Sequence, residues 1–215
     1  MLNAVLRLLT ISLSVLIVGF VAVFAVRRLS LGQNYVPPPH PFFQMDTWKI
    51  ARPTTDNPCL TEAPSPEWIL FERVGQAKDG SWQSLTCHSP LLQRLGQSRH
   101  RNWLLQVNMA DNHGLDELVK VLNAFDREKS FAIYAPAQQA ARYLRKQGPQ
   151  WAFAADAASL TRLHLFTSLW LEPALEFWPD FVLFSGDPQD GSALNEREIL
   201  EITRRKKRYV VPSAP

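Results

Sequence analysis

The sequence predicts an α/β domain in which eight short parallel strands close into a compact barrel, preceded by an apolar helix. Short apolar runs typical of buried strands recur through the second part of the chain, and from the fourth run onward helical patterns alternate with them. This alternation is typical of a parallel sheet. Eight strands suit a (β/α)8 barrel, although roughly 170 residues is short for one. An open, doubly wound sheet is the alternative. The eight runs begin at Trp48, Ile69, Gln83, Trp103, Phe131, Trp151, Phe181 and Tyr209.

The first part of the chain contains an uncharged run of 19 residues, Leu8 to Val26. At about 1.5 Å per residue, such a helix is roughly 28 Å long, close to the thickness of the hydrocarbon core of a bilayer. Arg27 and Arg28 follow it directly, as in a membrane stop. A cleaved signal peptide, ending near Ala25, is the alternative. We expect residues 1–28 to form a single-pass anchor, with membrane contacts from Leu8, Leu16, Phe20 and Val26.

A proline-rich segment separates the apolar run from the domain. We expect residues 29–46 to act as a semi-rigid spacer, because consecutive prolines favour an extended chain, and residues 47–215 to form the domain. Arginines flank the apolar run on both sides, so they barely determine its orientation; we place the domain on the extracytoplasmic side. Cys59 and Cys87 are the only two cysteines. They could pair in an exported domain and would be ordinary buried thiols in a cytosolic one.

The charge balance argues against one class of partner. The first 28 residues contain three arginines and no acidic residue, which leaves 20 basic and 20 acidic side chains in the rest of the chain. Domains that bind nucleic acid normally carry a surplus of lysine and arginine. We therefore expect no nucleic-acid partner. The basic run 204–208 could touch anionic lipid, but cations also suit the end of a helix, and we favour that explanation.

Helices between the strands are predicted from apolar spacing and from capping residues. A helix begins near Gly114, where leucines follow at helical spacing. A second helix is expected over residues 137–146, before a Gly-Pro pair. Asp156 is a good N-cap for a third helix. Asn195 and Glu198 form a capping-box pattern at the start of a fourth, which is expected to end near residue 208.

One stretch carries a more specific pattern. Lys78, Asp79 and Gly80 form a charged turn, and a short strand then leads to His88 and a Leu-x-x-Arg continuation that ends at Arg94. This stretch resembles the signature of the glycerophosphodiester phosphodiesterase family, and the coarser match of strand order extends over nearly all of the domain. The resemblance implies a TIM barrel that cleaves phosphodiesters with a divalent cation, and it places His88 at the end of a barrel strand as a catalytic candidate.

Most of the family's other motifs are altered here. The resemblance places Arg52 after the first strand as a phosphate-binding candidate, but the catalytic histidine before it is missing. In the second strand the family's two acids fall on Phe71 and Arg73. Glu72 lies between them, and this offset of one residue would point it to the opposite face of the strand.

The third and fourth strands differ as well. Ser89 stands where the acid after the histidine would be, and Gln106 and Asn108 replace a glutamate and a lysine of the fourth strand. Mg²⁺ and Ca²⁺ prefer anionic oxygen ligands, and most of them are lost. Weak candidates for replacement ligands are Glu72, Asp111, Asp187 and Asp190.

We therefore expect a membrane-anchored, phosphodiesterase-like domain that has lost catalysis and acts as a binding or structural module, with no resident cofactor. Its expected partners are the membrane and a phosphodiester or lipid headgroup. The alternative is an active phosphoric diester hydrolase of lipid metabolism that uses Mg²⁺ or Ca²⁺ in a rearranged site. A third hypothesis is an interaction protein of unrelated α/β fold, in which the match around His88 is accidental.

Overall fold

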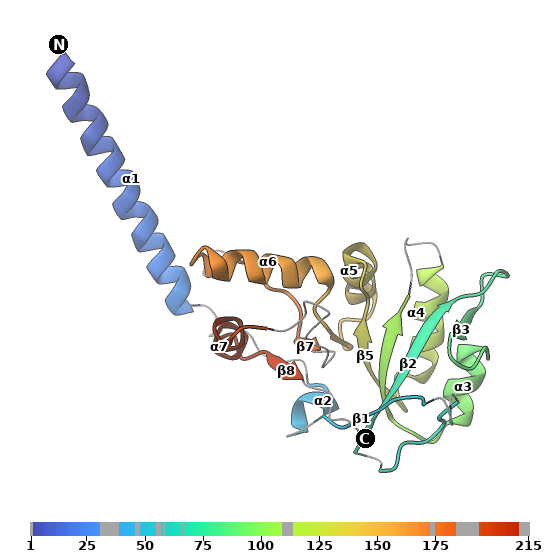
Figure 1. The fold of residues 1–215 in the computed structure, drawn as a ribbon. Helices are drawn as coiled ribbons and strands as arrows, with labels where there is room; N and C mark the ends of the chain where they lie inside the picture. Colours follow the sequence, from blue (N-terminus) through green and yellow to red (C-terminus); the bar gives the residue numbers. More distant parts are fainter. Residues whose placement is uncertain are drawn as a thin grey trace.

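The chain forms a mixed α/β structure with a mostly parallel central sheet (Figure 1). The computed structural model describes residues 2–30, 39–45, 48–54, 57, 59–65, 67–108, 114–172, 175–183 and 194–210. Its elements, in chain order, are α1 (Leu2–Ser30), α2 (Pro41–Gln44), β1 (Ile50–Ala51), β2 (Ile69–Gln76), β3 (Trp82–Ser84), α3 (Leu91–Gln97), β4 (Asn102–Val107), α4 (Leu115–Phe125), β5 (Ser130–Tyr134), α5 (Gln138–Gln147), β6 (Ala152–Phe153), α6 (Ala157–Ser168), β7 (Phe181–Leu183), α7 (Glu196–Arg204) and β8 (Arg208–Val210).

The parallel strands follow one another in the order of the chain. β1, β2, β4, β5 and β6 pair in this order, and β7 and β8 form a parallel pair of their own. A single bridge between Ala154 and Phe181 joins the two groups. A doubly wound sheet reverses its strand order at one point. No such reversal occurs among the described strands, so their order does not support the doubly wound alternative.

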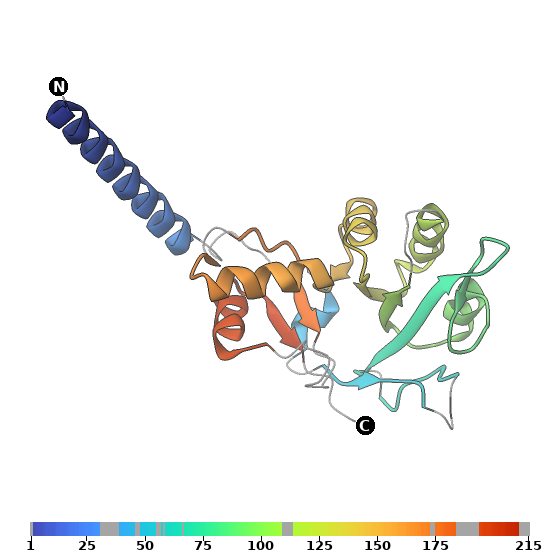
Figure 2. The same ribbon diagram turned by 45° about the horizontal axis from the view of Figure 1, so that its top comes forward.

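The helices that alternate with these strands cover the same face of the sheet. α3 packs against α4, α4 against α5, α5 against α6, and α6 against α7, and Figure 2 shows this succession around the outside of the strands. Between the sheet and α3, α4 and α5 lies a large apolar cluster, which includes Leu70, Trp103 and Phe131. A smaller cluster lies at α6, α7 and the β7–β8 pair. The predicted alternation of strands and helices after β4 is confirmed.

The other face of the sheet has its own core. One apolar cluster takes a side chain from each of the seven described parallel strands, and therefore the inner faces of all these strands converge. In its central row Phe71 is in register with Leu104, Leu104 with Ala132, and Ala132 with Ala152. The strands contribute Ile50, Ile69, Leu104, Ala132, Ala152, Phe181 and Val210.

Aromatic packing links the two ends of the strand order. Trp48, just before β1, lies with its ring centroid 4.8 Å from that of Phe181, at the start of β7. Phe42 of α2 is fully buried against Trp48, at 5.2 Å between centroids. Arg208 of β8 donates hydrogen bonds to backbone oxygens in and after α2. The sheet is therefore curled so that β1 approaches β7 and β8, and α2 covers the edge where the strands begin.

The α2 helix lies within the segment 29–46 that was predicted to be a spacer. Its N-cap is His40, whose ring nitrogen accepts a hydrogen bond from the backbone N–H of Phe42 at 3.4 Å. Burial lowers the pKa of His40 to about 4, so the ring is neutral at physiological pH and can act as an acceptor. The end of this segment therefore packs as part of the domain.

The prediction of eight parallel strands was wrong for β3. This strand pairs antiparallel with β2, with Gly75 opposite Gln83 and Gln76 opposite Trp82. The reason is the turn between them: Gly80 has φ +86°, and Asp79 accepts hydrogen bonds from the backbone N–H and hydroxyl of Ser81. Such an Asp-Gly turn closes a hairpin. The charged turn of the sequence motif therefore makes a hairpin instead of leading to a barrel strand.

A disulfide joins Cys59, in the loop after β1, to Cys87, before α3. It closes a loop with a sequence separation of 28 residues. The sequence left the pairing of these cysteines open, and the structure brings them together.

We expect the double substitution of Cys59 and Cys87 by serine to lower the free energy of unfolding by about 2–4 kcal/mol, because the disulfide restricts the unfolded chain. Urea unfolding followed by circular dichroism measures the change. In a reducing buffer the wild-type and double-serine chains should unfold at the same urea concentration. Equal midpoints in an oxidising buffer would contradict the expectation.

The α1 helix covers the apolar run and lies apart from the sheet in both views (Figures 1 and 2). The exposed large apolar side chains between Leu9 and Val23, among them Leu16 and Phe20, have 55–70% of their surface open. The side chains of Leu8 and Val26 are outside the described set. Within the part of the chain that the structure describes, no helix reaches the length and apolarity required to cross a bilayer. The anchor over residues 1–28 stays a prediction.

Candidate functional site

Polar side chains replace the apolar core at the edge where the parallel strands end. Along β2, Ile69 and Phe71 belong to the inner face, and strand alternation places Arg73 on the same face. Arg73 is in register with Gln106 of β4, which is in register with Tyr134 of β5. Two residues farther along the strands than the Phe71–Leu104–Ala132 row, the next row on the same face therefore carries a guanidinium, an amide and a phenol. In an open or closed parallel sheet, this is the edge where ligands bind.

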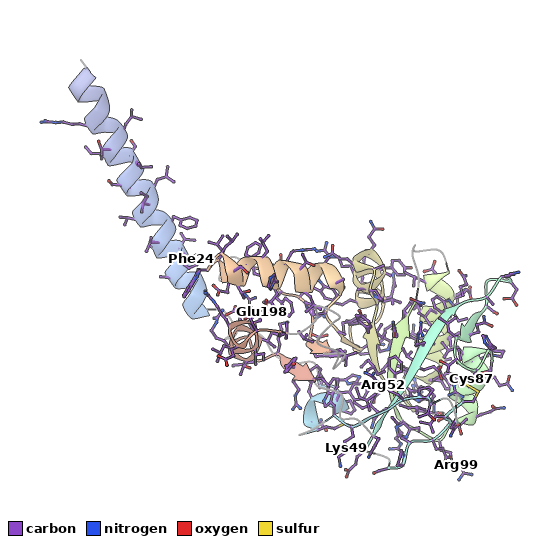
Figure 3. All side chains as sticks on the ribbon, in the orientation of Figure 1. Phe24, Lys49, Arg52, Cys87, Arg99 and Glu198 are labelled. Carbon is purple, nitrogen blue, oxygen red and sulfur yellow. A yellow bond between two sulfur atoms is a disulfide. The ribbon has the colours of Figure 1, made fainter. Side chains whose placement is uncertain are left out.

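A second guanidinium lies beside this row. Arg52 follows β1 directly, and its Cζ atom lies 5.6 Å from the ring centroid of Phe71, so it extends over the inner face of β2 (Figure 3). Arg52 and Arg73 are both exposed. β1 and β2 are neighbours in the sheet. Two adjacent strands therefore present positive charge to solvent at the same edge. We refer to Arg52, Arg73, Gln106 and Tyr134 as the edge site.

Asp156 is the described carboxylate close to the edge site, and both of its oxygens already accept hydrogen bonds. Asp156 is fully buried after β6 and is the N-cap of α6, as predicted. Its Oδ1 accepts from the backbone N–H of Ser159 at 2.8 Å and its Oδ2 from the hydroxyl of Ser159 at 3.0 Å. Burial raises the pKa of Tyr134, and the negative charge of Asp156 raises it further. Tyr134 therefore keeps its proton at neutral pH and can donate a hydrogen bond.

The metal-ligand candidate Glu72 lies on the opposite face of β2. Its neighbours in register, Leu105 and then Ile133, belong to the cluster under the helices. The fully buried carboxylate accepts a hydrogen bond from the hydroxyl of Ser84 at 2.7 Å and forms an ion pair with Arg94 of α3. The predicted offset of one residue is confirmed. Glu72 serves the packing of β2, β3 and α3 and does not contribute to the edge site.

The catalytic candidate His88 lies in the turn between β3 and α3. Its side chain is exposed, its backbone has φ +51°, and its N–H donates to the carbonyl oxygen of Ser84 at 3.0 Å. This turn follows the antiparallel strand β3 and begins level with Arg73, because Leu85 donates its backbone N–H to the carbonyl oxygen of Arg73 at 2.8 Å. Among the described residues, no hydrogen bond or ring contact joins His88 to Arg52.

The remaining acidic candidates cannot be placed. Asp111, Asp187 and Asp190 lie outside the described residues. Among the side chains that the structure does describe, no group of three or more His, Cys, Asp or Glu residues could hold a metal ion.

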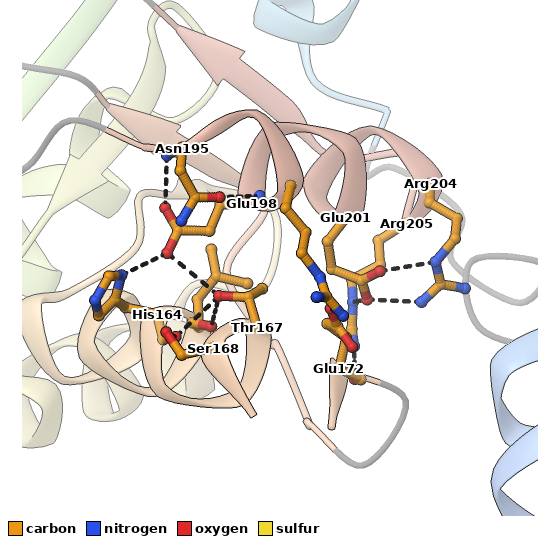
Figure 4. Close-up of polar contacts among 11 residues, drawn as sticks. His164, Thr167, Ser168, Glu172, Asn195, Glu198, Glu201, Arg204 and Arg205 are labelled. Carbon is orange, nitrogen blue, oxygen red and sulfur yellow. Dashed lines mark hydrogen bonds and ion pairs between the residues drawn. The ribbon is translucent and has the colours of Figure 1, made fainter. Parts of the chain in front are cut away.

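A second polar cluster lies between α6 and α7 (Figure 4). Glu198 is buried, and its carboxylate contacts the ring of His164 at 2.8 Å and the backbone N–H of Asn195 at 2.8 Å. The side chain of Asn195 accepts from the backbone N–H of Glu198 at 2.9 Å, which confirms the predicted capping box. Thr167 also donates to Glu198. These contacts fix the start of α7 against α6, and we assign them a structural role.

The basic run 204–208 makes most of its described contacts with other parts of the domain. Arg204 and Arg205 both pair with Glu201, and Arg205 also donates to the carbonyl oxygens of Glu172 and Leu175. Lys207 is buried against the carbonyl oxygens of residues 178 and 179. Burial lowers the pKa of Lys207 to about 7. α7 ends at Arg204, earlier than predicted, and most of the following cations hold the β7–β8 region together.

Comparisons with protein-family models, with curated proteins and with solved structures find no match to this chain. The function must therefore be argued from the edge site itself. The family resemblance indicates Arg52 as a phosphate-binding candidate, whereas Arg73 stands at the position of a lost acid. The alternation of Ile69, Phe71 and Arg73 along one strand was the signal that could have identified Arg73 as part of a site.

Proposed function

We propose that this chain is a membrane-anchored, phosphodiesterase-like domain that binds a phosphate-bearing ligand at the edge site without hydrolysing it. The observation that carries the proposal is the pair Arg52 and Arg73, which lie on the inner face of neighbouring strands with Tyr134 and Gln106 beside them. Guanidinium groups form strong, paired hydrogen bonds to phosphate oxygens. The amide and the phenol can donate further hydrogen bonds to the same anion.

The arrangement of the strands supports a barrel of the TIM type. Seven parallel strands follow the chain order, all the alternating helices cover one face, and the inner faces share one core. Trp48 and Phe181 bring the first strand close to the seventh. In barrels of this type the functional site lies where the strands end. The edge site has this position, and it is compatible with descent from the glycerophosphodiester phosphodiesterases.

Loss of catalysis follows from the chemistry of the edge site. Hydrolysis of a phosphodiester needs acid–base groups, and in the resembled family it also needs a cation bound by carboxylates. Asp156 is bonded to Ser159, Glu72 lies under the helices, and His88 lies in the turn after β3, with no described bond to a residue of the edge site. The described residues therefore offer positive charge for binding and little for proton transfer.

We expect Arg73→Gln to weaken binding of sn-glycerol 3-phosphate about 10- to 100-fold, because one charged hydrogen-bonding group contributes roughly 1.5–3 kcal/mol. Arg52→Gln should have a similar effect. Titration calorimetry on the full chain in detergent micelles measures the affinity. Arg99→Gln is the matched control, because it removes the same charge from an exposed loop at the opposite edge of the sheet, before β4. Equal affinity in all four proteins would contradict the proposed site.

The same preparation separates binding from catalysis. Incubation with glycerophosphocholine and Mg²⁺, Ca²⁺ or a chelator should give no hydrolysis. Metal-dependent hydrolysis that is lost in His88→Ala would contradict the proposal and favour the active enzyme. Asp111, Asp187 and Asp190 would then be the first residues to substitute.

The anchor and the compartment belong to the same proposal. The support for the anchor is the uncharged run of α1, whose large apolar side chains are open to the surroundings. The disulfide between Cys59 and Cys87 supports a domain on the extracytoplasmic side, because disulfides persist in oxidising compartments. Vesicle flotation of the full chain tests the anchor, and protease accessibility of the domain in cells tests its side.

A further inference from the structure

The helix α6 ends in an unusual way at Trp170. Its last turn closes with hydrogen bonds from the N–H of Leu171 to the carbonyl of Phe166 and from the N–H of Trp170 to the carbonyl of Thr167. This is a Schellman motif, and Trp170 occupies its left-handed position with φ +58°. Glycine is the favoured residue there, since a side chain with a Cβ atom is strained in this conformation. A bulky aromatic residue at this position therefore works against the fold locally.

Trp170 is also the most exposed of the seven tryptophans. Its surface is 71% open, whereas Trp48, Trp82, Trp103 and Trp151 are buried and the other two, Trp68 and Trp178, are half-buried. Such a strained and exposed residue is more typical of a contact surface than of a structural element.

Trp170 belongs to an apolar surface patch on α6 and α7. Leu165 and Leu169 are 52% and 56% exposed on the last turns of α6, and Leu200 of α7 is 69% exposed. The guanidinium of Arg197 stacks on the ring of Trp170, with Cζ 3.5 Å from its centroid, and Leu200 is three residues farther along the same helix face. We call Leu165, Leu169, Trp170 and Leu200 the Trp170 patch. Contiguous exposed apolar side chains of this kind mark contact sites.

The connection to α1 restricts what can cover this patch. α6 leaves the edge where the strands end, so its C-terminal end and Trp170 lie toward the edge where the strands begin, which α2 covers. The ten residues between α1 and α2 can span at most about 35 Å. In both ribbon views the C-terminal end of α1 lies beside the end of α6 and beside α7 (Figures 1 and 2). The apolar helix and the apolar patch are therefore on the same side of the domain.

We propose that the Trp170 patch docks on the surface of the bilayer that holds α1, with the indole ring at the level of the lipid headgroups. Tryptophan is favoured at this depth, because its ring is apolar and its N–H can still bond to water or headgroups. Arg197, stacked on the ring, forms an ion pair with Glu172, which holds it in this position. Docking in this orientation turns the edge site away from the membrane, toward soluble ligands. The inference depends on the proposed anchor.

Quenching of tryptophan fluorescence by lipids with brominated acyl chains tests this contact. The full chain is reconstituted in vesicles of phosphatidylcholine and phosphatidylglycerol, with and without bromine labels. We expect bromine to quench a long-wavelength part of the emission, because only the exposed Trp170 emits there. This quenching should be lost in Trp170→Phe and retained in Trp68→Phe, which removes a half-buried tryptophan elsewhere.

The variant Trp170→Gly separates docking from folding. We expect it to lose the quenching and to unfold at a urea concentration no lower than that of the wild type, since glycine adopts the left-handed conformation without strain. A lower unfolding midpoint would show that the stacking of Arg197 on Trp170 outweighs the backbone strain, and long-wavelength quenching retained in this variant would reject the membrane contact.

Three further results would overturn the inference, and they differ in meaning. Equal quenching in the wild type and Trp170→Phe would reject the patch while leaving the anchor intact. Failure of the full chain to float with vesicles would reject the anchor and the docking together. Protection of Trp170 from iodide that grows with protein concentration in detergent would instead assign the patch to a second copy of the chain.

Discussion

Arg94→Met is expected to lower the free energy of unfolding by about 3–5 kcal/mol, because it leaves the carboxylate of Glu72 buried without a compensating charge. Glu72 is fully buried, and after the substitution the hydroxyl of Ser84 would be its one remaining partner among the described residues. Arg94 also donates to the carbonyl oxygen of Leu60, so the loop after β1 loses a contact too. Urea unfolding followed by circular dichroism at pH 7 measures the change.

The matched control replaces both members of the ion pair. Glu72→Met combined with Arg94→Met removes the two buried charges together, and apolar side chains of similar volume often replace such a pair at little cost. We expect the double variant to be clearly more stable than Arg94→Met alone. If the single and double variants were equally unstable, the loss would come from altered packing of α3 instead of from the unpaired charge.

Phe181→Ala is also expected to lower the free energy of unfolding by about 3–5 kcal/mol, because it leaves a cavity in the inner core. Phe181 is fully buried, packs on Trp48, and forms the bridge that joins β6 to β7. The substitution removes the side chain through which the two ends of the strand order meet. Thermal and urea unfolding of the full chain measure the effect.

Two controls identify the origin of this loss. Phe181→Leu keeps most of the apolar volume, and we expect it to cost much less than Phe181→Ala. Leu183→Ala, two residues farther along β7 on the same face, lies at a half-buried position and should also cost less. A small effect of Phe181→Ala would mean that the contact between Trp48 and β7 contributes little to the stability of the curled sheet.

The edge site and the Trp170 patch lie at opposite ends of the domain, relative to the direction of the parallel strands. Residues of the edge site follow the parallel strands, while Trp170 ends a helix that runs back toward their beginnings. The proposed ligand binding and the proposed membrane contact should therefore respond to different substitutions. Arg73→Gln should leave bromine quenching unaltered, and Trp170→Phe should leave the affinity for sn-glycerol 3-phosphate unaltered.

The sequence by itself determined the local elements. Apolar runs and capping residues located the parallel strands and the helices α4 to α7, and Asp156 and Asn195 cap α6 and α7 as predicted. These features depend on side chains a few residues apart, which a pattern can capture. The offset of Glu72 was predictable for the same reason, since successive residues of a strand point to opposite faces.

Only the tertiary structure decided which of these residues meet. The hairpin at Asp79 and Gly80 turned β3 antiparallel and left His88 in a turn instead of at the end of a parallel strand. The register of β2, β4 and β5 brought Arg73, Gln106 and Tyr134 into one row. Burial of Phe42 against Trp48 made part of an expected spacer into the cover of the sheet. The register of the strands and the burial of Phe42 depend on contacts between distant parts of the chain, for which local spacing carries no signal. The Asp-Gly turn is a local hairpin signal, but only the pairing of β3 with β2 showed that it outweighs the pattern of a parallel strand.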